Sequence, residues 1–590
     1  MSLASGPARI DLITEPAGTG DGGEPRWQSY AEEVLDHWRL PHRTVSVGEV
    51  EPGAAALLLF PTPPRLSDAD RDRVERVLRG GGSVVVVGGP GGLAELAGCR
   101  TAADRSTGVV VGAHSSLWPG SLQRLRAFGG VALSVSDAEV VARWGDGPIA
   151  IAVRRVGAGR IAVIGLDLWQ TIVRIQQGWP VSRDGTPALD GSAPVDEGIL
   201  KTDDGIALSY EEDRSLPAGR LPADTYEHVQ PPRPVPVFDR PLADAWREIL
   251  LRILVALSAE RGHALPWLYY WPAGAPAVVH ISNDSDGNRD ADAAAILDVW
   301  DEGGIRGTFC YLYPGGLSPA TVRRIRGEGH ELALHHDALS GGDDRSWGRE
   351  RLLLQADWLR RETGIDRIVS NKNHYLRWEG WDDFYLWCEE AGIEVDQSHG
   401  PTKQGNVGFP FGSCHLSFPL TGSTDGRRSS VLSLPLLTQD LALTTPAGTR
   451  EVLLSGALEH HGVAHLLFHG VHIRTKPEVR RALRRTIRRG HELGLPFWTS
   501  EQLNDWERAR RGVRLEATRT EGGWRVDVES EGELWGAALL LPAAGVNPGA
   551  RIDVSPDHAA ASVVDRHGLR HVEIAADLPA GTSTFDVTLA

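Results

Sequence analysis

Polar and ionisable residues end a series of short apolar runs in the middle of the chain. These endings are NDSDG at 283–287 after AVVHIS, HHD at 335–337 after HELAL, NKNH at 371–374 after RIVS, QSH at 397–399 after IEVD, TQD at 438–440 after LSLPLL, and HGVH at 469–472 after HLLF. One polar ending is uninformative, because every strand stops somewhere. Six in series, four of them containing histidine, indicate that polar groups gather where the strands end.

The residue types at these endings suit a divalent metal hydrolase. One carboxylate and two imidazoles hold a hard-to-borderline cation and leave a position open for water. The bound water becomes a nucleophile near neutral pH, and a second carboxylate can take its proton. A further histidine can then protonate the leaving amine.

These residues meet only if the apolar runs are strands that share one face of a barrel. Short apolar runs alternate with helical stretches over about residues 278–500, which predicts a β/α barrel. The carboxyl ends of barrel strands lie together, and active sites are found on that face. We therefore expect the polar endings to converge on one pocket.

Four segments in this region resemble the polysaccharide deacetylase (NodB-homology) superfamily in their order and spacing. They are HISNDSDG at 280–287, GGIRGTFCYLY at 303–313, GEGHELALHH at 327–336 and LPFWTSEQLNDWERAR at 495–510. The resemblance covers roughly residues 274–510. It implies a distorted β/α barrel of the deacetylase type, a divalent metal with zinc as first choice, and hydrolysis of an N-acetylated sugar or a related amide or ester.

The resemblance also implies roles for three catalytic-face residues. Asp284 is the expected base, Asp286 the carboxylate ligand of the metal, and His469 the general acid. Ser285 separates the two aspartates, so their roles can be exchanged. His472 can likewise exchange roles with His469.

The two histidine ligands are less directly implied. His335 matches a family ligand, but the family's second histidine, four residues further on, is absent. The segment NKNHYLRW at 371–378 resembles a divergent branch of the superfamily and supplies His374 as the second ligand. His336 remains the alternative.

Each assignment has a simpler structural interpretation. Asp284 can cap a turn, and His374 can be a hydrogen-bonded histidine with no ligand role. Arg377 and Trp378 are the expected substrate-binding residues, although Trp378 can equally be packing.

The first segment, residues 1–181, predicts an open parallel α/β domain. The runs IDLIT, AALLLF, SVVVV and RIAVIGL are typical of buried parallel strands, and a helix is expected to start at Ser67. The pattern resembles class I glutamine amidotransferase-like domains, which carry a catalytic cysteine at the turn after the equivalent of SVVVV. That turn is GGPGG at 88–92 here, and Cys99 lies seven residues beyond it. The resemblance therefore implies a non-catalytic domain.

The remaining segments complete an α/β multidomain prediction. Residues 182–272 are expected to be a linker or insert with one helix near Leu242, residues 273–511 the barrel, and residues 512–590 a small C-terminal β-sandwich.

Composition limits the partners. A formal charge of −17 argues against a nucleic-acid binder, and no apolar run reaches the roughly 20 residues that span a bilayer. Four scattered cysteines and the absence of a visible secretory signal favour a cytoplasmic protein. We expect a small-molecule or carbohydrate substrate. The alternative is a non-catalytic glycan-binding or scaffolding protein on a degenerate deacetylase fold.

Overall fold

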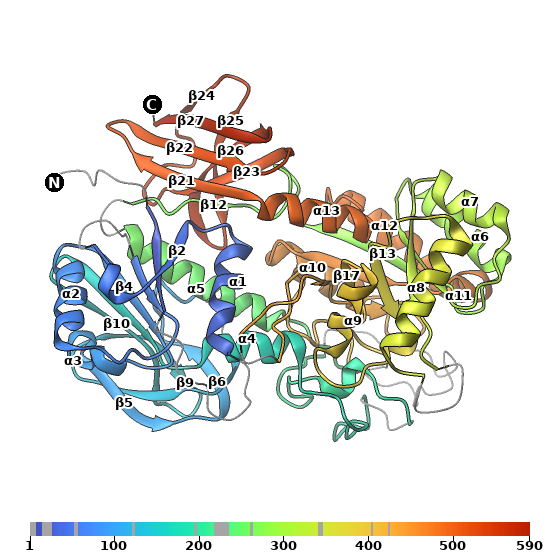
Figure 1. The fold of residues 1–590 in the computed structure, drawn as a ribbon, viewed down its shortest axis with the longest axis horizontal. Helices are drawn as coiled ribbons and strands as arrows, with labels where there is room; N and C mark the ends of the chain where they lie inside the picture. Colours follow the sequence, from blue (N-terminus) through green and yellow to red (C-terminus); the bar gives the residue numbers. More distant parts are fainter. Residues whose placement is uncertain are drawn as a thin grey trace.

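The computed structural model describes residues 8–14, 26–51, 57–120, 124–193, 198–216, 235–259, 263–339, 346–402, 405–422 and 425–589. Within these ranges the strands form one large mixed sheet, one curled parallel sheet and two small antiparallel sheets. In Figure 1 the N-terminal sheet lies at the left, the curled sheet at the right and the C-terminal strands above the N-terminal part. The helices in the described ranges include none that is long and apolar enough to cross a membrane.

One half of the N-terminal sheet is parallel, as its apolar runs predict. The neighbouring strands are β2 His42–Val45, β1 Ile10–Ile13, β3 Leu57–Phe60, β4 Ser83–Val87 and β11 Gly159–Ile164. Apolar side chains fill both faces of the four central strands of this set, which is typical of parallel strands covered on both sides. The helix expected at Ser67 is confirmed as α2 (Asp68–Arg79), and the Ser67 hydroxyl accepts from the Asp70 backbone N–H at 3.2 Å.

The other half of this sheet departs from the predicted open parallel domain. It consists of antiparallel strands, namely β5 Cys99–Asp104, β6 Thr107–Gly112, β7 Arg124–Phe128, β8 Val131–Val135, β9 Glu139–Trp144 and β10 Ile149–Val156. The turn WGDG at 144–147 joins β9 to β10, and such Asp-Gly pairs favour tight hairpins. The sheet is therefore mixed.

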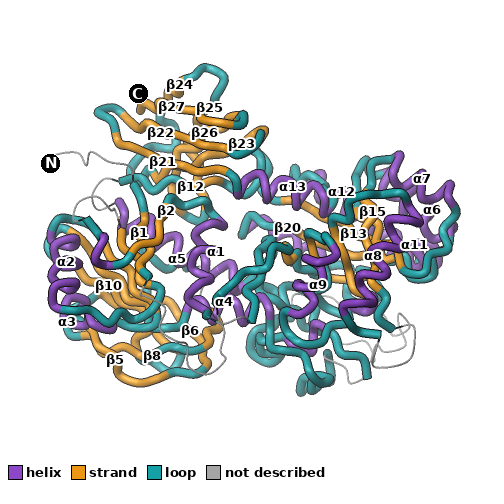
Figure 2. The backbone as a smooth tube through the Cα atoms, viewed as in Figure 1, coloured by secondary structure: helices purple, strands orange, loops and turns teal. Residues whose placement is uncertain are grey.

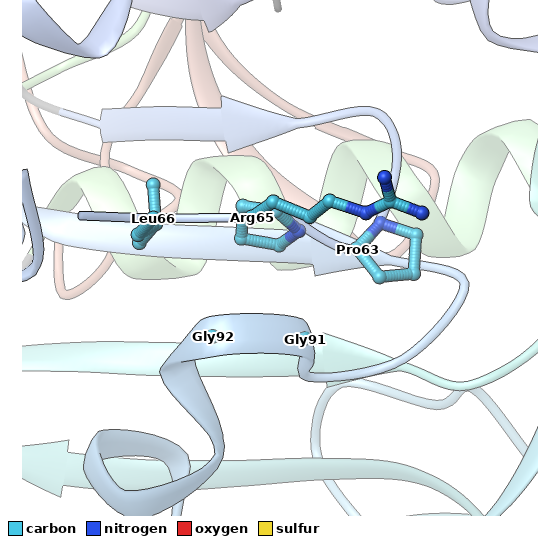
Figure 3. A pocket seen from close by; sticks show the side chains of 6 residues that line it. Pro63, Arg65, Leu66, Gly91 and Gly92 are labelled. Atoms are coloured by element: carbon cyan, nitrogen blue, oxygen red, sulfur yellow. The ribbon is translucent and has the colours of Figure 1, made fainter.

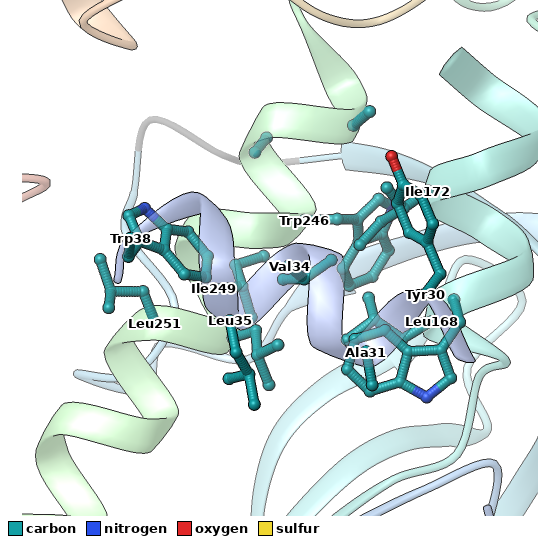
Figure 4. Packing of buried hydrophobic residues seen from close by; sticks show 14 of the residues in the cluster. Tyr30, Ala31, Val34, Leu35, Trp38, Leu168, Ile172, Trp246, Ile249 and Leu251 are labelled. Atoms are coloured by element: carbon teal, nitrogen blue, oxygen red, sulfur yellow. The ribbon is translucent and has the colours of Figure 1, made fainter. Parts of the chain in front are cut away.

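Three helices pack against one another and against this sheet, and their apolar side chains belong to one large hydrophobic core. They are α1 (Tyr30–His37), α4 (Leu168–Gln177) and α5 (Leu242–Ser258), and Figure 4 shows their apolar side chains interleaved. The helix predicted near Leu242 is α5. Nearly all of its residues are buried, so this helix of the expected linker belongs to the N-terminal core.

The curled parallel sheet has eight strands in the order β18-β17-β16-β15-β14-β13-β20-β19. It lies at the right of Figure 2, where β13, β15 and β20 are labelled. Their bounds are β13 Val278–Asp284, β14 Thr308–Leu312, β15 Glu331–His336, β16 Ser370–Asn373, β17 Val395–Asp396, β18 Leu432–Ser433, β19 Thr438–Gln439 and β20 Val463–Leu467. The helices that accompany them are α6 Asp290–Glu302, α7 Pro319–Gly327, α8 Arg349–Thr363, α9 Asp383–Ala391, α10 Thr449–Glu459, α11 Gly470–Thr475, α12 Pro477–Glu492 and α13 Ser500–Arg511. The carboxyl ends of the strands consequently face one side, as a barrel-like arrangement requires.

The C-terminal strands form two four-stranded antiparallel sheets with an apolar cluster between them. Their strands are β21 Val513–Arg519, β22 Gly523–Ser530, β23 Leu534–Pro542, β24 Ile552–Ser555, β25 Ala560–Arg566, β26 Leu569–Leu578 and β27 Gly581–Leu589, joined by β12 Trp267–Leu268. Strand β12 comes from the expected linker and pairs with β23. The linker also reaches the barrel side, where Phe238 forms a bridge with Gly408.

Buried ionic contacts join the three parts. Glu248 of α5 contacts His460 after α10 at 2.6 Å and His567 of the β25–β26 turn at 3.2 Å. Arg511 at the end of α13 contacts Glu33 of α1 at 2.8 Å. Each contact links elements far apart in the sequence.

Candidate metal centre

Asp286 after β13, His335 on β15 and His374 after β16 come together at the carboxyl ends of these strands. One ligand atom from each lies within 4.8 Å of the other two. His335 Nε2 is 3.3 Å from Asp286 Oδ1, and His374 Nε2 is 3.8 Å from the same oxygen. These three residues are the expected metal ligands, and they come from the ends of β13, β15 and β16.

The hydrogen bonds of the histidines leave their ligand atoms available. His335 Nδ1 lies 2.9 Å from the Lys372 carbonyl, which can only accept, so Nδ1 carries the proton and Nε2 of the neutral ring has a free lone pair. His374 Nδ1 is held in the same way by Asp337 at 3.4 Å. Among the described residues, buried His335 Nε2 and Asp286 Oδ1 make no hydrogen bond of good geometry. This donor set fits a divalent cation.

The electrostatics of Asp286 support the same conclusion. Burial raises the pKa of its carboxyl, but His469, His335 and His374 outweigh burial and hold the pKa well below its usual range. Burial lowers the pKa of His335, but Asp284 and Asp286 outweigh burial and raise that pKa. An ionised carboxylate therefore faces three imidazoles.

Asp284 has a different environment from Asp286. Lys372 Nζ lies 3.2 Å from Asp284 Oδ1 and donates to Ser282 Oγ at 2.6 Å. The other oxygen, Oδ2, is 3.7 Å from His335 Nε2. Asp284 is thus paired with a cation on one side and faces the cluster with the other.

The Lys372 side chain is 0% exposed, and the sequence carries an overlooked signal for it. Of 61 lysines and arginines, four are lysine, at positions 201, 372, 403 and 476. Arginine thus supplies nearly every cation of this chain. The rarity of lysine is the signal that marks Lys372 as a site residue, which the strand-ending pattern alone did not single out.

His469 shares a carboxylate with His472. Asp440 Oδ2 lies 2.6 Å from His469 Nδ1 and 2.7 Å from His472 Nδ1, while the His469 backbone N–H donates to Oδ1 at 2.9 Å. His469 Nε2 points into the cluster, 3.5 Å from Asp286 Oδ2. Burial lowers the pKa of His469, but Asp440 and Asp286 outweigh burial and raise it to about 10. Asp440 was expected only as a strand ending, and here it orients the imidazole.

His336 lies outside this group. It follows His335 on β15 and points to the other side of the strand, where its ring stacks on Phe384 at 5.8 Å. Burial lowers the pKa of His336 to about 3. The gathered set therefore contains His374 rather than His336.

The expected substrate-binding residues lie in packed surroundings. Trp378 is 2% exposed and contacts Phe384 at 5.2 Å and His399 at 4.5 Å between ring centroids. Arg377 donates to the Ala338 carbonyl, to Ser346 and to Glu379. The Trp378 indole is therefore not exposed for substrate binding, and the Arg377 guanidinium is engaged in hydrogen bonds that connect neighbouring loops.

Backbone strain concentrates around the centre. Ten described residues other than glycine have positive φ, and six of them lie in the loops after β13, β16 and β19: Asp286, Asn288, Tyr375, Leu376, Asp440 and Ala442. Such conformations cost about 1–3 kcal/mol each and persist where surrounding contacts impose them. These loops are accordingly shaped to place side chains.

The glycine-rich turn of the N-terminal sheet lies apart from this centre. It borders a hollow of about 750 Å³ lined by Pro63, Pro64, Arg65, Leu66, Gly91 and Gly92 (Figure 3). Cys99 begins β5, and burial raises the pKa of its thiol to about 11. The thiol is therefore not an activated nucleophile.

Comparison with known proteins gives structural neighbours only. No family model and no curated protein matches the sequence. A protein named as a polysaccharide deacetylase from Mycobacterium smegmatis is 20% identical, with 42% of this chain and 96% of that chain covered and a TM-score of 0.32. A peptidoglycan N-acetylglucosamine deacetylase is 16% identical, with 40% and 92% covered and a TM-score of 0.27. A β-galactosidase from G. stearothermophilus is 14% identical, with 28% of each chain covered and a TM-score of 0.23. Because these TM-scores are all below 0.5, the chemistry of the site has to be inferred from its own side chains.

Proposed function

We propose that this chain is a metal-dependent hydrolase that deacetylates an N-acetylated sugar or a related amide or ester. The observation that carries the proposal is the grouping of Asp286, His335 and His374 within 4.8 Å, with ligand atoms facing one another. Asp284 and His469 stand beside that group, each fixed by a buried partner.

Asp286, His335 and His374 would hold the ion. One carboxylate and two imidazoles suit zinc, which is the first choice. When bound, such an ion polarises the carbonyl oxygen and lowers the pKa of a water so that it attacks near neutral pH.

Asp284 acts as the base in this proposal. Lys372 fixes one of its oxygens, and the other oxygen faces the cluster, 3.7 Å from His335 Nε2. That oxygen takes the proton of the attacking water as the new C–O bond forms. The pairing with Lys372 supports the base role for Asp284 and the ligand role for Asp286 in this proposal.

His469 acts as the acid. Asp440 accepts from its Nδ1, which leaves Nε2 directed into the cluster. As the C–N bond breaks, the Nε2 proton passes to the departing nitrogen. The products are an amine and a carboxylic acid, which ionises to the carboxylate and releases its proton to solvent. The proton taken up by Asp284 is returned through solvent to His469, which restores both residues.

Metal content tests the proposal directly. We expect close to stoichiometric zinc in the reconstituted wild type and loss of zinc in D286A, H335A and H374A. H336A is the matched control, because His336 follows His335 on the same strand but packs against Phe384.

Activity then separates the ligands from the acid and base. Asp284→Asn and His469→Gln should keep zinc and lose acetate release from N-acetylated sugars by about 10²–10⁴-fold. Zinc retained in H374A but lost in H336A would move the second ligand. A wild type that takes up no divalent metal on reconstitution would rule out the hydrolase and leave a glycan-binding protein.

A further inference from the structure

Tyr375 is a large aromatic side chain exposed beside the proposed metal centre. Its side chain is 48% exposed, and its ring lies edge-on to the ligand His374 with 4.8 Å between centroids. The neighbouring aromatic Trp378 is buried. Tyr375 therefore presents an exposed ring directly beside the proposed metal ligand His374.

The backbone at Tyr375 is strained. It has φ 58° and ψ 14°, and the next residue, Leu376, has φ 51°. Left-handed backbone is adopted by glycine at 29 described positions of this chain. Glycine would adopt it at position 375 without steric penalty, so a bulky aromatic residue in this strained conformation points to a role for the side chain.

Surrounding contacts impose this conformation. Leu376 packs into a small buried cluster with Leu436 and Leu467, and the Asn373 side chain donates to the Arg377 carbonyl at 3.0 Å. As a result, the Leu376 side chain points into the protein and the Tyr375 side chain points toward its surface.

The segment before α5 supports the same loop from outside. The Trp378 backbone N–H donates to the Leu200 carbonyl at 3.0 Å, and residue 201 forms an antiparallel bridge with residue 377. Lys201 Nζ lies 5.6 Å from the centroid of the Tyr375 ring, within cation–π range. One side of the ring is therefore braced by this segment.

Resting on the proposed function, we propose that Tyr375 is the platform on which the sugar ring of the substrate stacks while its acetyl group faces the metal ligands. An aromatic face binds the C–H face of a pyranose through apolar and dispersion contact. Tyr375 would therefore determine preference for acetylated rings over acyclic acetyl compounds.

The variant Tyr375→Gly separates this role from a structural one. Glycine relieves the left-handed strain, so we expect unchanged or higher thermal stability together with weaker ring binding. If Tyr375 only supported the fold, Tyr375→Gly would lower the thermal stability of the protein instead. Tyr375→Trp keeps an aromatic ring at this position and should therefore bind the sugar ring as the wild type does. The matched control is Trp535→Ala, which removes an aromatic side chain that is 59% exposed on the C-terminal sheets.

The probes are a tetramer of N-acetylglucosamine and methyl acetate, with zinc-loaded protein. In Tyr375→Gly we expect KM for the tetramer to rise about 5- to 10-fold, which is the loss of one aromatic contact, and methyl acetate hydrolysis to stay unchanged. Saturation-transfer NMR with the tetramer measures binding without turnover.

The outcomes distinguish this inference from the proposed function. Tyr375-dependent tetramer binding without hydrolysis of either probe would support the platform and overturn the hydrolase. Equal tetramer KM in wild type and Tyr375→Gly, or no tetramer binding by the wild type, would overturn the platform. An equal loss in Trp535→Ala would also overturn it.

Discussion

Removal of Lys372 should destabilise the protein through Asp284 rather than through lost packing. The ammonium and carboxylate are 3.2 Å apart and almost fully buried. At an effective dielectric constant of about 20, Coulomb's law gives about 5 kcal/mol for this separation. Removing one partner of a buried pair leaves an uncompensated charge and costs about 3–5 kcal/mol, so Lys372→Met should lower the free energy of unfolding by that amount.

The double variant tests whether the loss comes from the pair. Asp284→Asn in the Lys372→Met background removes the unpaired charge, and we expect it to recover most of the loss. Urea unfolding of the two single variants and the double variant gives the coupling energy. Lys476→Met, at a partly exposed lysine before α12, is the control and should change stability little. Losses that simply add in the double variant would refute the reasoning.

Two further predictions follow from the geometry of the buried carboxylates. Asp440→Asn should lower kcat at least 10-fold with KM and zinc content unchanged, because His469 loses its charged acceptor at 2.6 Å; a parallel rise in KM would contradict this positioning role. Burial lowers the pKa of His460, but Glu248 outweighs burial and raises it from 6.5 to about 9. The pair's stabilisation, about 3 kcal/mol, is therefore full below pH 6.5 and lost as pH rises through about 9. The Tm difference between wild type and Glu248→Gln should shrink over that window, and a constant difference would contradict the assignment.

Much of the candidate site could be predicted because strand ends are visible in the sequence. Asp286, His335 and His374 each follow an apolar run, and the parallel order of β13 to β16 places those ends side by side. Apolar runs also predicted the parallel strands β1, β3, β4 and β11. Such patterns report which residues are buried and where burial stops.

Orientation within the loops could not be predicted in this way. Two consecutive left-handed residues turn Leu376 inward and Tyr375 outward, and that reversal leaves no trace in hydrophobic periodicity. Trp378 was therefore expected at the substrate, whereas Tyr375 is the exposed ring. Likewise, Lys372 on β16 reaches Asp284 at the end of β13 although these two strands are not paired, and only the curl of the sheet brings them together.

The antiparallel half of the N-terminal sheet was missed for a related reason. Strands β5, β6 and β8 are only partly buried, so they lack the uniform apolar runs that mark the parallel strands. Pairing partners in such strands are set by turn geometry and register rather than by composition.

The path of residues 235–272 has a consequence for how this protein can change over evolutionary time. Helix α5 completes the N-terminal core, Phe238 bridges to the barrel at Gly408, and strand β12 joins the C-terminal sheets. A single connecting stretch therefore contributes buried surface to three neighbours at once. Exchange of any one part by recombination at the linker would expose apolar surface in another, so the three parts are expected to be inherited as a unit and to accumulate substitutions in concert.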